Sequence, residues 1–334
     1  MIFLKNICRI IIIGFLILFL YEIFLSYGPY SKGVSPVIYD ETIGMWHKKT
    51  FSSKVKNECY DNIFYFDKLG LVLNQNDHSK SKKNILIFGD SQIEALMVPN
   101  ENIIHNRLDK LLNKNYNVYN FGLSGSTPMT NFMSIKYKTQ DIIDNTDLII
   151  QFINISYISD VNLNYSSIDR PKVDIRFKSL DEYYVVPIRK KTFIDYTMDK
   201  IGKYEIFSFI KITLIKSTTI LNKLLSYSVF ANDEIFSKNN IVNSIGSIYQ
   251  INLFLKEKNI NYIPVLFNIG DNNNEFKNLK EFFLINQIDY IDLDKALIES
   301  KNEIKYFSCD GHWNSYDHKV IADLVYNKIK MIKN

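Results

Sequence analysis

The feature that most constrains the fold of this chain is an apolar run that breaks at a Gly-Asp-Ser turn. Residues 84–88 read Asn-Ile-Leu-Ile-Phe, and Gly89-Asp90-Ser91 follows at once. A run of large apolar residues ending in a small turn residue is typical of a central strand in a parallel sheet. Ligands of open α/β sheets bind beyond the carboxyl ends of such strands. Ser91 is therefore expected at the mouth of the sheet, at or near a helix N-terminus, where free N–H groups favour developing negative charge.

A serine in that position needs a base before it can act as a nucleophile. The chain has five histidines, and His312 is the one flanked by a carboxylate, a glycine and an aromatic, in the run Asp310-Gly311-His312-Trp313-Asn314. His105 and His318 are expected on helix surfaces instead. An acid that orients a histidine, which in turn activates a serine, is the general logic of a catalytic triad. The sequence therefore indicates Ser91, His312 and Asp310 as nucleophile, base and orienting acid.

The Gly89-Asp90-Ser91 and Asp310–Asn314 segments resemble the SGNH (GDSL-type) hydrolase and acyltransferase superfamily, through four short blocks spread over residues 84–330. The resemblance implies a flavodoxin-like three-layer α/β sandwich with a central parallel sheet, and no metal or organic cofactor. It also implies the same roles for Ser91 and His312. The second family block matches residues 120–126 and points to the N–H groups of Gly125 and of Ser91 itself as oxyanion-hole donors.

The third block departs from the family pattern, which is Gly-Asn-Asp after a strand. Here the strand at residues 148–152 leads into Asn154-Ile155-Ser156. The downstream Ser159-Asp160 fits the register that puts Ser156 in the place of the family asparagine, and Asn154 is the alternative. Loss of one well-placed donor costs about 3–4 kcal/mol of transition-state stabilisation, so this departure leaves a slow or specialised site as an option.

The last block departs in its spacing, because the acid stands two residues before the histidine and Cys309 occupies the position three residues before it. The Asp310-x-His312-Trp313 pattern resembles that of alginate-type polysaccharide O-acetyltransferases, which favours sugar acyl chemistry. Trp313 can then line a sugar site through its aromatic face, or it can pack in the core.

Strand-like and helix-like segments alternate over residues 84–334, which predicts a parallel sheet with right-handed crossovers. Residues 29–83 are expected to form an irregular lead-in segment. Residues 161–240 interrupt the alternation with lysines interleaved with large apolar residues. This insertion is expected to be a helical cap over the active site, and a basic amphipathic helix on an anionic membrane surface is the compatible alternative.

The amino terminus, residues 1–28, predicts a single-pass membrane anchor. Residues 10–21 are apolar apart from Gly14, and Lys5 and Arg9 precede most of the run. A helix needs about 20 such residues to cross a bilayer, and the positive-inside rule keeps the basic end in the cytoplasm. The following domain is then extracytoplasmic, at the cell membrane. The alternative is a buried N-terminal helix of a soluble domain.

The formal net charge of +4 is mild and the lysines are scattered, which gives no case for nucleic acid as a partner. The three cysteines lack metal-ligand spacing. In an extracytoplasmic domain, Cys59 and Cys309 could form a disulfide that ties the lead-in segment to the histidine loop. The alternative is two unrelated thiols.

These patterns together predict a serine-dependent esterase that acts, through an acyl-enzyme, on O-acyl groups (acetyl above all) of a cell-surface glycan or another small ester. An O-acyltransferase of the same fold, which moves the acyl group onto a polysaccharide, is the first alternative. The second is a glycan-binding or assembly protein that keeps the fold but has lost activity, motivated by the third block.

Overall fold

The computed structural model describes residues 36–75, 78–113, 115–158, 173–186, 233–268 and 273–333, together with helical residues 9, 12–14 and 16–21. The chain divides into two compact units. The first unit comprises Met1–Ser35 and Lys190–Asn232, and the helical residues between 9 and 21 are its described part. The second unit comprises Pro36–Arg189 and Asp233–Asn334, and it contains every candidate site residue.

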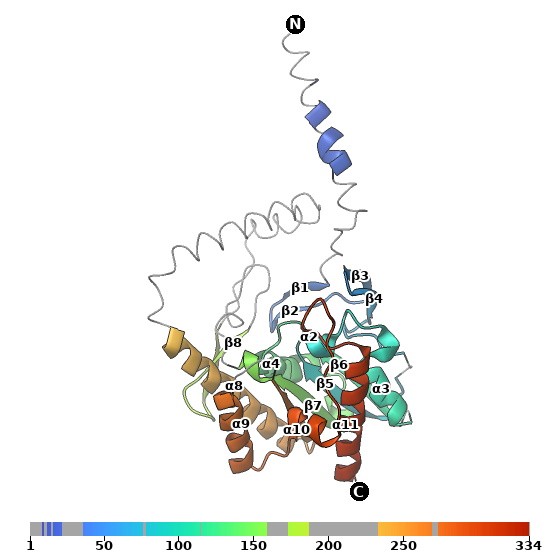
Figure 1. Ribbon diagram of the computed structural model, residues 1–334. Helices are drawn as coiled ribbons and strands as arrows, with labels where there is room; N and C mark the ends of the chain where they lie inside the picture. The colour runs from blue at the N-terminus through green and yellow to red at the C-terminus, as the bar shows by residue number, and fades with distance from the viewer. Residues whose placement is uncertain are drawn as a thin grey trace. The chain divides into compact units, whose positions relative to one another are not determined.

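A five-stranded parallel sheet forms the centre of the second unit (Figure 1). Its strands are β5 (Lys83–Gly89), β6 (Tyr116–Gly122), β7 (Thr146–Asn154), β10 (Asn261–Phe267) and β11 (Ile291–Asp292). They lie in the order β6-β5-β7-β10-β11. Numbered along the chain, this is the order 2-1-3-4-5 of flavodoxin-like folds, in which ligands bind at the carboxyl ends where the order reverses. The predicted parallel α/β sheet is confirmed.

The central strands are apolar on both faces because helices cover both faces. In β5 the alternating side chains of Ile85 and Ile87 enter one hydrophobic cluster, and those of Leu86 and Phe88 enter another. All four side chains are fully buried. The continuous apolar run that marks this strand in the sequence is thus the consequence of two cores, one on each side of the sheet.

The helices supply the outer layers of the sandwich (Figure 1). One cluster packs the sheet against α3 (Ile104–Leu111), α10 (Leu293–Glu299) and α11 (Ser315–Lys333). The clusters of the opposite face include residues of α4 (Pro128–Lys138), α8 (Asp233–Glu257) and α9 (Asn273–Ile285). Single turns complete the connections: α2 (Ser91–Glu94), η1 (Asn100–Asn102), η2 (Ile143–Asn145) and η3 (Ile155–Tyr157).

The segment 29–83 differs from the expected irregular lead-in. From residue 37 it contains two antiparallel hairpins, which pair β1 (Val37–Asp40) with β2 (Gly44–His47) and β3 (Phe51–Asn57) with β4 (Tyr60–Phe66). The two-residue loop Glu58–Cys59 closes the second hairpin, as is common for tightly turned strands. β3 alternates between half-buried and exposed side chains, a half-buried strand pattern that Lys54 and Lys56 mark in the sequence.

The insertion expected at 161–240 lies mostly outside the described residues. Its described part contains a β-hairpin, β8 (Asp174–Phe177) and β9 (Tyr183–Val186), where a helical cap was expected. The first turns of α8 follow from Asp233. The basic segment from Arg189 to Lys223 lies outside the described residues.

Among the residues that the structure describes, no helix is both long and apolar enough to cross a membrane. Much of the predicted anchor, residues 1–28, lies outside them. Its described apolar side chains, from Ile12 to Leu20, are between 51% and 65% exposed.

Gly122, at the carboxyl end of β6, lies against the backbone of α2. A Cβ atom there would lie 2.2 Å from the amide nitrogen of Glu94 and 2.6 Å from the carbonyl carbon of Ile93. We expect Gly122→Ala to lower the free energy of unfolding by at least about 3 kcal/mol, because neither backbone atom can move freely. Denaturant unfolding followed by circular dichroism measures this loss.

Gly311→Ala is the matched control, since an added Cβ there meets no atom within 4 Å. We expect it to change the stability by no more than about 0.5 kcal/mol. Equal effects of the two substitutions would contradict the close approach of β6 to α2.

Candidate active site

Ser91 begins α2 directly after β5, at the point where the sheet order reverses. Asp90 caps this turn, because its side chain accepts the N–H of Gln92 at 2.9 Å and its carbonyl accepts the N–H of Glu94 at 3.0 Å. The helix has only four residues and ends at Ala95, which adopts a left-handed conformation. Ser91 is therefore held at a tight strand-to-helix junction, as the first residue of a single-turn helix.

The three predicted triad residues lie together although 221 residues separate Ser91 from His312. Nε2 of His312 lies 2.9 Å from Oγ of Ser91. On the other side of the ring, Nδ1 lies 3.2 Å from Oδ1 of Asp310, without the alignment of a formed hydrogen bond. The same carboxylate oxygen accepts the backbone N–H of His312 at 3.0 Å. Such bonds are often poorly aligned before substrate binds, so the arrangement suits a serine–histidine–aspartate relay.

The residue next to the nucleophile holds the histidine loop in place. The buried side chain of Gln92 donates to the carbonyl oxygen of Gly311 at 3.0 Å and accepts the N–H of Trp313 at 2.8 Å. These two backbone groups flank His312 on either side. A single amide thus fixes the backbone of the base to the turn that carries Ser91.

The far end of the histidine loop is fixed by a capping box at the start of α11. Asn314 accepts the N–H of Asp317 at 3.2 Å, and Asp317 accepts the N–H of Asn314 at 2.9 Å, the reciprocal pair of that motif. Asp317 also accepts the N–H groups of Lys305 and Tyr306 at 2.7 and 2.9 Å. The fully buried carboxylate of Asp317 therefore joins both ends of the loop.

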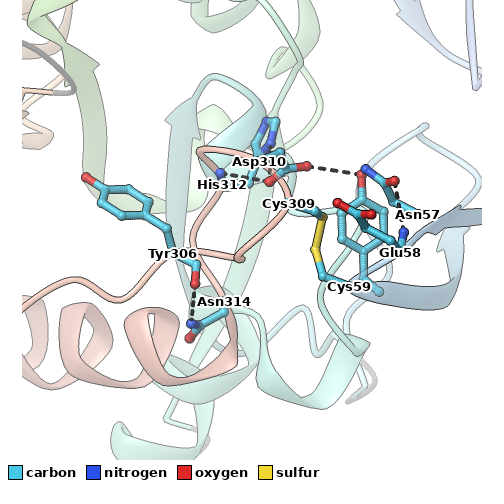
Figure 2. The surroundings of a disulfide bond; sticks show 9 residues. Asn57, Glu58, Cys59, Tyr306, Cys309, Asp310, His312 and Asn314 are labelled. Carbon is cyan, nitrogen blue, oxygen red and sulfur yellow. Dashed lines mark hydrogen bonds and ion pairs between the residues drawn. A yellow bond between two sulfur atoms is a disulfide. The ribbon is translucent and has the colours of Figure 1, made fainter.

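A disulfide between Cys59 and Cys309 links the β3–β4 hairpin to the histidine loop (Figure 2). Their Cα atoms are 5.8 Å apart, within the usual range for a bridge. The predicted disulfide is therefore present in the structure, and the two-thiol alternative is not. The bridged cysteines are 250 residues apart in the sequence, and closing a loop of that length stabilises a fold by about 5 kcal/mol in the chain-entropy model.

The same hairpin contacts the acid directly. The hydroxyl of Tyr60 donates to Oδ2 of Asp310 at 3.1 Å, and its ring packs edge-on against Phe307 at 5.2 Å. Burial raises the pKa of Tyr60 above its usual value; the hydrogen bond with Asn57 opposes this rise, and the nearby charge of Asp310 adds to it. The phenol is thus a stable donor that helps to aim the carboxylate at His312.

Gly125 lies in the loop after β6 and has a φ of +72°, which favours glycine. The N–H groups of Ser91 and Gly125 have no hydrogen-bond acceptor within the described part of the chain. Their role as oxyanion donors stays a prediction.

Asn154 and Ser156 differ in what they contact. Asn154 ends β7, the neighbour of β5, and its Nδ2 donates to Oδ2 of Asp90 at 3.3 Å. The hydroxyl of Ser156 donates to Oδ1 of Asn268 at 3.3 Å, and its N–H donates to Oδ1 of Asn154 at 3.1 Å. Of the two, Asn154 is the one that contacts the residue preceding the nucleophile, and an oxyanion role for either stays a prediction.

The carboxyl of Asp90 is almost fully buried beside this amide. Burial raises its pKa to about 6, against the opposing effects of the Gln92 and Asn154 hydrogen bonds and the nearby His312. Because its folded pKa lies above the unfolded one, this carboxyl favours the folded state most below about pH 4, and that contribution is lost as the pH rises through 6. Asp90 therefore acts as a cap that is costly to ionise.

Trp313 is buried in the core and does not line a sugar site. It is 1% exposed and packs against Phe267 and Phe152, with ring centroids 4.8 and 6.1 Å away. Its backbone N–H donates the hydrogen bond that the Gln92 side chain accepts. Of the two roles weighed from the sequence, core packing is the one that the structure supports.

His105 and His318 are buried, so the expectation that they lie on helix surfaces is wrong. Burial lowers the pKa of each to about 3. His105 donates through Nε2 to the carbonyl of Leu73 at 3.3 Å and accepts from Asn120 through Nδ1 at 3.1 Å. These polar partners come from distant segments, which helical spacing in the sequence cannot reveal.

Within the described ranges, no three histidine, cysteine, aspartate or glutamate side chains lie close enough to hold a metal ion together. The side chains that sequence reasoning missed are Gln92, Tyr60 and Asp317. The capping-box pattern Asn314-Ser315-Tyr316-Asp317 was a readable signal for the last of them.

Several solved structures are similar to this chain in fold. One comes from Desulfitobacterium hafniense DCB-2, and its name places it among lipolytic proteins of the G-D-S-L family; it is 11% identical, with a TM-score of 0.39, over 74% of this chain and 99% of that one. An acetylxylan esterase from Geobacillus stearothermophilus is 13% identical, with a TM-score of 0.40, over 75% of this chain and 95% of that one. A two-domain esterase active on acetylated mannans is 10% identical, with a TM-score of 0.40, over 75% of this chain and 50% of that one.

No family model matches the sequence, and no curated protein matches it either. At the identities and TM-scores of the solved structures, the likeness carries no argument about activity. The function must therefore be inferred from the geometry of the site itself.

Gln92→Leu removes both hydrogen bonds that flank His312 and replaces the amide with an apolar side chain of similar size. We expect kcat for ester hydrolysis to fall by about 10- to 100-fold with KM nearly unchanged, because small displacements of a catalytic group cost that much. Steady-state kinetics on an aryl acetate measure both constants.

Gln250→Leu is the control, because the side-chain amide of Gln250, on α8, donates to the carbonyl of Leu180 and takes no part in the histidine loop. It should leave both constants at the wild-type values. A wild-type kcat for Gln92→Leu would show that the amide does not position the base.

Tyr60→Phe removes only the hydroxyl that donates to Asp310 and keeps the ring that packs on Phe307. We expect kcat to fall by about three- to tenfold, the worth of a partly exposed hydrogen bond to a charged group. Tyr65→Phe, a substitution on the exposed side of the same strand, is the control and should be silent in the same assay. An unchanged kcat in both variants would mean that the Tyr60 hydroxyl does not help to aim the acid.

Proposed function

We propose that this chain is an SGNH-type serine esterase that removes O-acyl groups through an acyl-enzyme. The observation that carries the proposal is the 2.9 Å contact of Ser91 Oγ with His312 Nε2, with the Asp310 carboxylate on the opposite side of the ring. A serine, a base and an orienting acid in this relation are what nucleophilic acyl transfer requires.

In acylation, Oγ of Ser91 attacks the ester carbonyl and Nε2 of His312 takes its proton. The negative charge of Asp310 stabilises the imidazolium that forms. The N–H groups of Ser91 and Gly125 and the amide of Asn154 stabilise the oxygen of the tetrahedral intermediate. The intermediate collapses with loss of the alcohol, which takes the proton from Nε2, and the acyl group remains on Ser91.

In deacylation, His312 removes a proton from water, which attacks the acyl carbonyl. The bond from the acyl carbon to Oγ of Ser91 then breaks, Oγ takes the proton back from Nε2, and the acid is released. A sugar hydroxyl in place of water would give transfer instead of hydrolysis. The residues of the two reactions are the same, and the exclusion of water from the site decides between them.

We further propose that the substrate is an O-acetylated glycan outside the cytoplasm and that the chain is anchored in the cell membrane. The Asp310-x-His312-Trp313 spacing, similar to that of polysaccharide O-acetyltransferases, supports sugar acyl chemistry. Lys5 and Arg9 beside the apolar residues 10–21 support an inside-to-outside orientation. The Cys59–Cys309 disulfide supports an oxidising compartment.

A serine-reactive fluorophosphonate probe tests the proposal on the full chain in detergent. We expect labelling of the wild type, no labelling of Ser91→Ala, and a loss of ester turnover of at least about 10³-fold in that variant. Ser52→Ala, which alters an exposed serine on β3, is the control and should label like the wild type.

Release of acetate from an acetylated glycan, compared with transfer to an unacetylated one, then separates esterase from transferase. Equal labelling of the wild type and Ser91→Ala, with no turnover in either, would falsify the proposal and favour a binding protein of this fold.

A further inference from the structure

Glu94 is a buried carboxylate that the proposed reaction does not use. It ends α2, three residues after Ser91, and is only 2% exposed. Taking an ionised carboxylate out of water is costly unless partners compensate for the lost solvation. Two side chains do so here, His47 and Ser124.

His47 reaches Glu94 from β2. Its Nδ1 lies 2.9 Å from the carbonyl oxygen of Gly70, and its Nε2 lies 2.6 Å from Oε1 of Glu94. A carbonyl oxygen can only accept, so Nδ1 carries a proton. One further proton is then shared between Nε2 and Oε1, and the pair is neutral as a whole whichever atom holds it. This neutrality lets both groups be buried, at 1% and 2% exposure.

Ser124 occupies the other oxygen of the carboxylate and is the residue before Gly125. Its hydroxyl donates to Oε2 of Glu94. The loop has two more anchors: the N–H of Leu123 donates to the carbonyl of Gly89 at 3.1 Å, and the hydroxyl of Ser126 donates to Asn131 at 2.8 Å. The peptide that joins Ser124 to Gly125 carries the N–H of Gly125, so an anchor on the Ser124 side chain controls where that N–H points.

We infer that Glu94 is a positioning residue that aims the Gly125 N–H at the oxyanion through Ser124, with His47 fixing the carboxylate from the β1–β2 hairpin. The inference rests on the proposed function, because it concerns the same oxyanion hole. It assigns a role at the site to the β1–β2 hairpin, which precedes the α/β sandwich in the sequence. It also explains why a charged residue occupies the last position of a buried single-turn helix.

Ser124→Ala is the sharpest test, because Ser124 is half-buried at a loop and its hydroxyl can be removed with little effect on packing. The full chain is assayed with p-nitrophenyl acetate as substrate and with phenylboronic acid, whose adduct with a serine mimics the tetrahedral anion. We expect kcat to fall by about tenfold or more and boronate inhibition to weaken by a similar factor, with KM within about twofold of the wild type. Ser124→Thr, which keeps the hydroxyl, should recover most of both.

Ser247→Ala is the matched control, since it too removes one hydroxyl hydrogen bond, here a buried one of 2.8 Å to the carbonyl of Asn243 within α8. It should lower only the melting temperature. A purely structural role for Ser124 would give the same pattern, with kcat and boronate affinity unchanged, and would overturn the inference.

Glu94→Gln supplies the second variant, combined with Ser124→Ala in a double-mutant cycle. If both act through one contact, the double variant should lose no more activity than Glu94→Gln alone. Additive losses would show that Glu94 does not act through Ser124. If the wild-type chain itself has no Ser91-dependent turnover, the proposed function fails and this inference fails with it; an active wild type with an unaffected Ser124→Ala overturns the inference alone.

Discussion

The contact between Ser91 and His312 depends on the parallel sheet, because Ser91 directly follows its strand β5. Because β5, β6 and β7 run in the same direction, their carboxyl ends bring the turn at Asp90, the loop of Gly125 and the amide of Asn154 to one edge. The order reversal at β5 opens that edge to a ligand. The base, His312, comes from a loop near the end of the chain. The apolar cluster that packs α11 against the sheet holds this loop near Ser91.

Precision at the site comes from polar groups that bridge distant segments, each buried or half-buried. Gln92 fixes the backbone on both sides of the base, Asp317 closes the loop that carries it, and Tyr60 contacts the acid. Burying such groups costs free energy, which is offset only when their hydrogen bonds are satisfied. The β3–β4 hairpin adds a covalent link through Cys59, so the segment before the sandwich is a structural part of the site.

Much of the fold could be predicted from local pattern. The buried runs of the five parallel strands and the helical spacing of α3 and α11 are visible in the sequence. A strand buried on both faces is apolar throughout, and a helix buried on one face repeats its apolar residues at helical spacing. The hairpins before residue 83 were missed because β1 and β2 have only four residues each and β3 and β4 carry polar side chains on their exposed face. The position of Asn154 against Asp90 could not be predicted either, because two candidate residues lie two positions apart and only the end of β7 distinguishes them.

The sequence by itself determined which groups could carry the proposed chemistry, because Gly89-Asp90-Ser91 follows a buried strand and Asp310-x-His312 lies in a late loop. Only the tertiary structure decided how those groups are held. Whether Trp313 faces a ligand or the core, whether Cys59 meets Cys309, and which partner satisfies each buried polar side chain depend on contacts across as many as 250 residues. No local period encodes such contacts, since they arise only when separate elements pack around a common sheet.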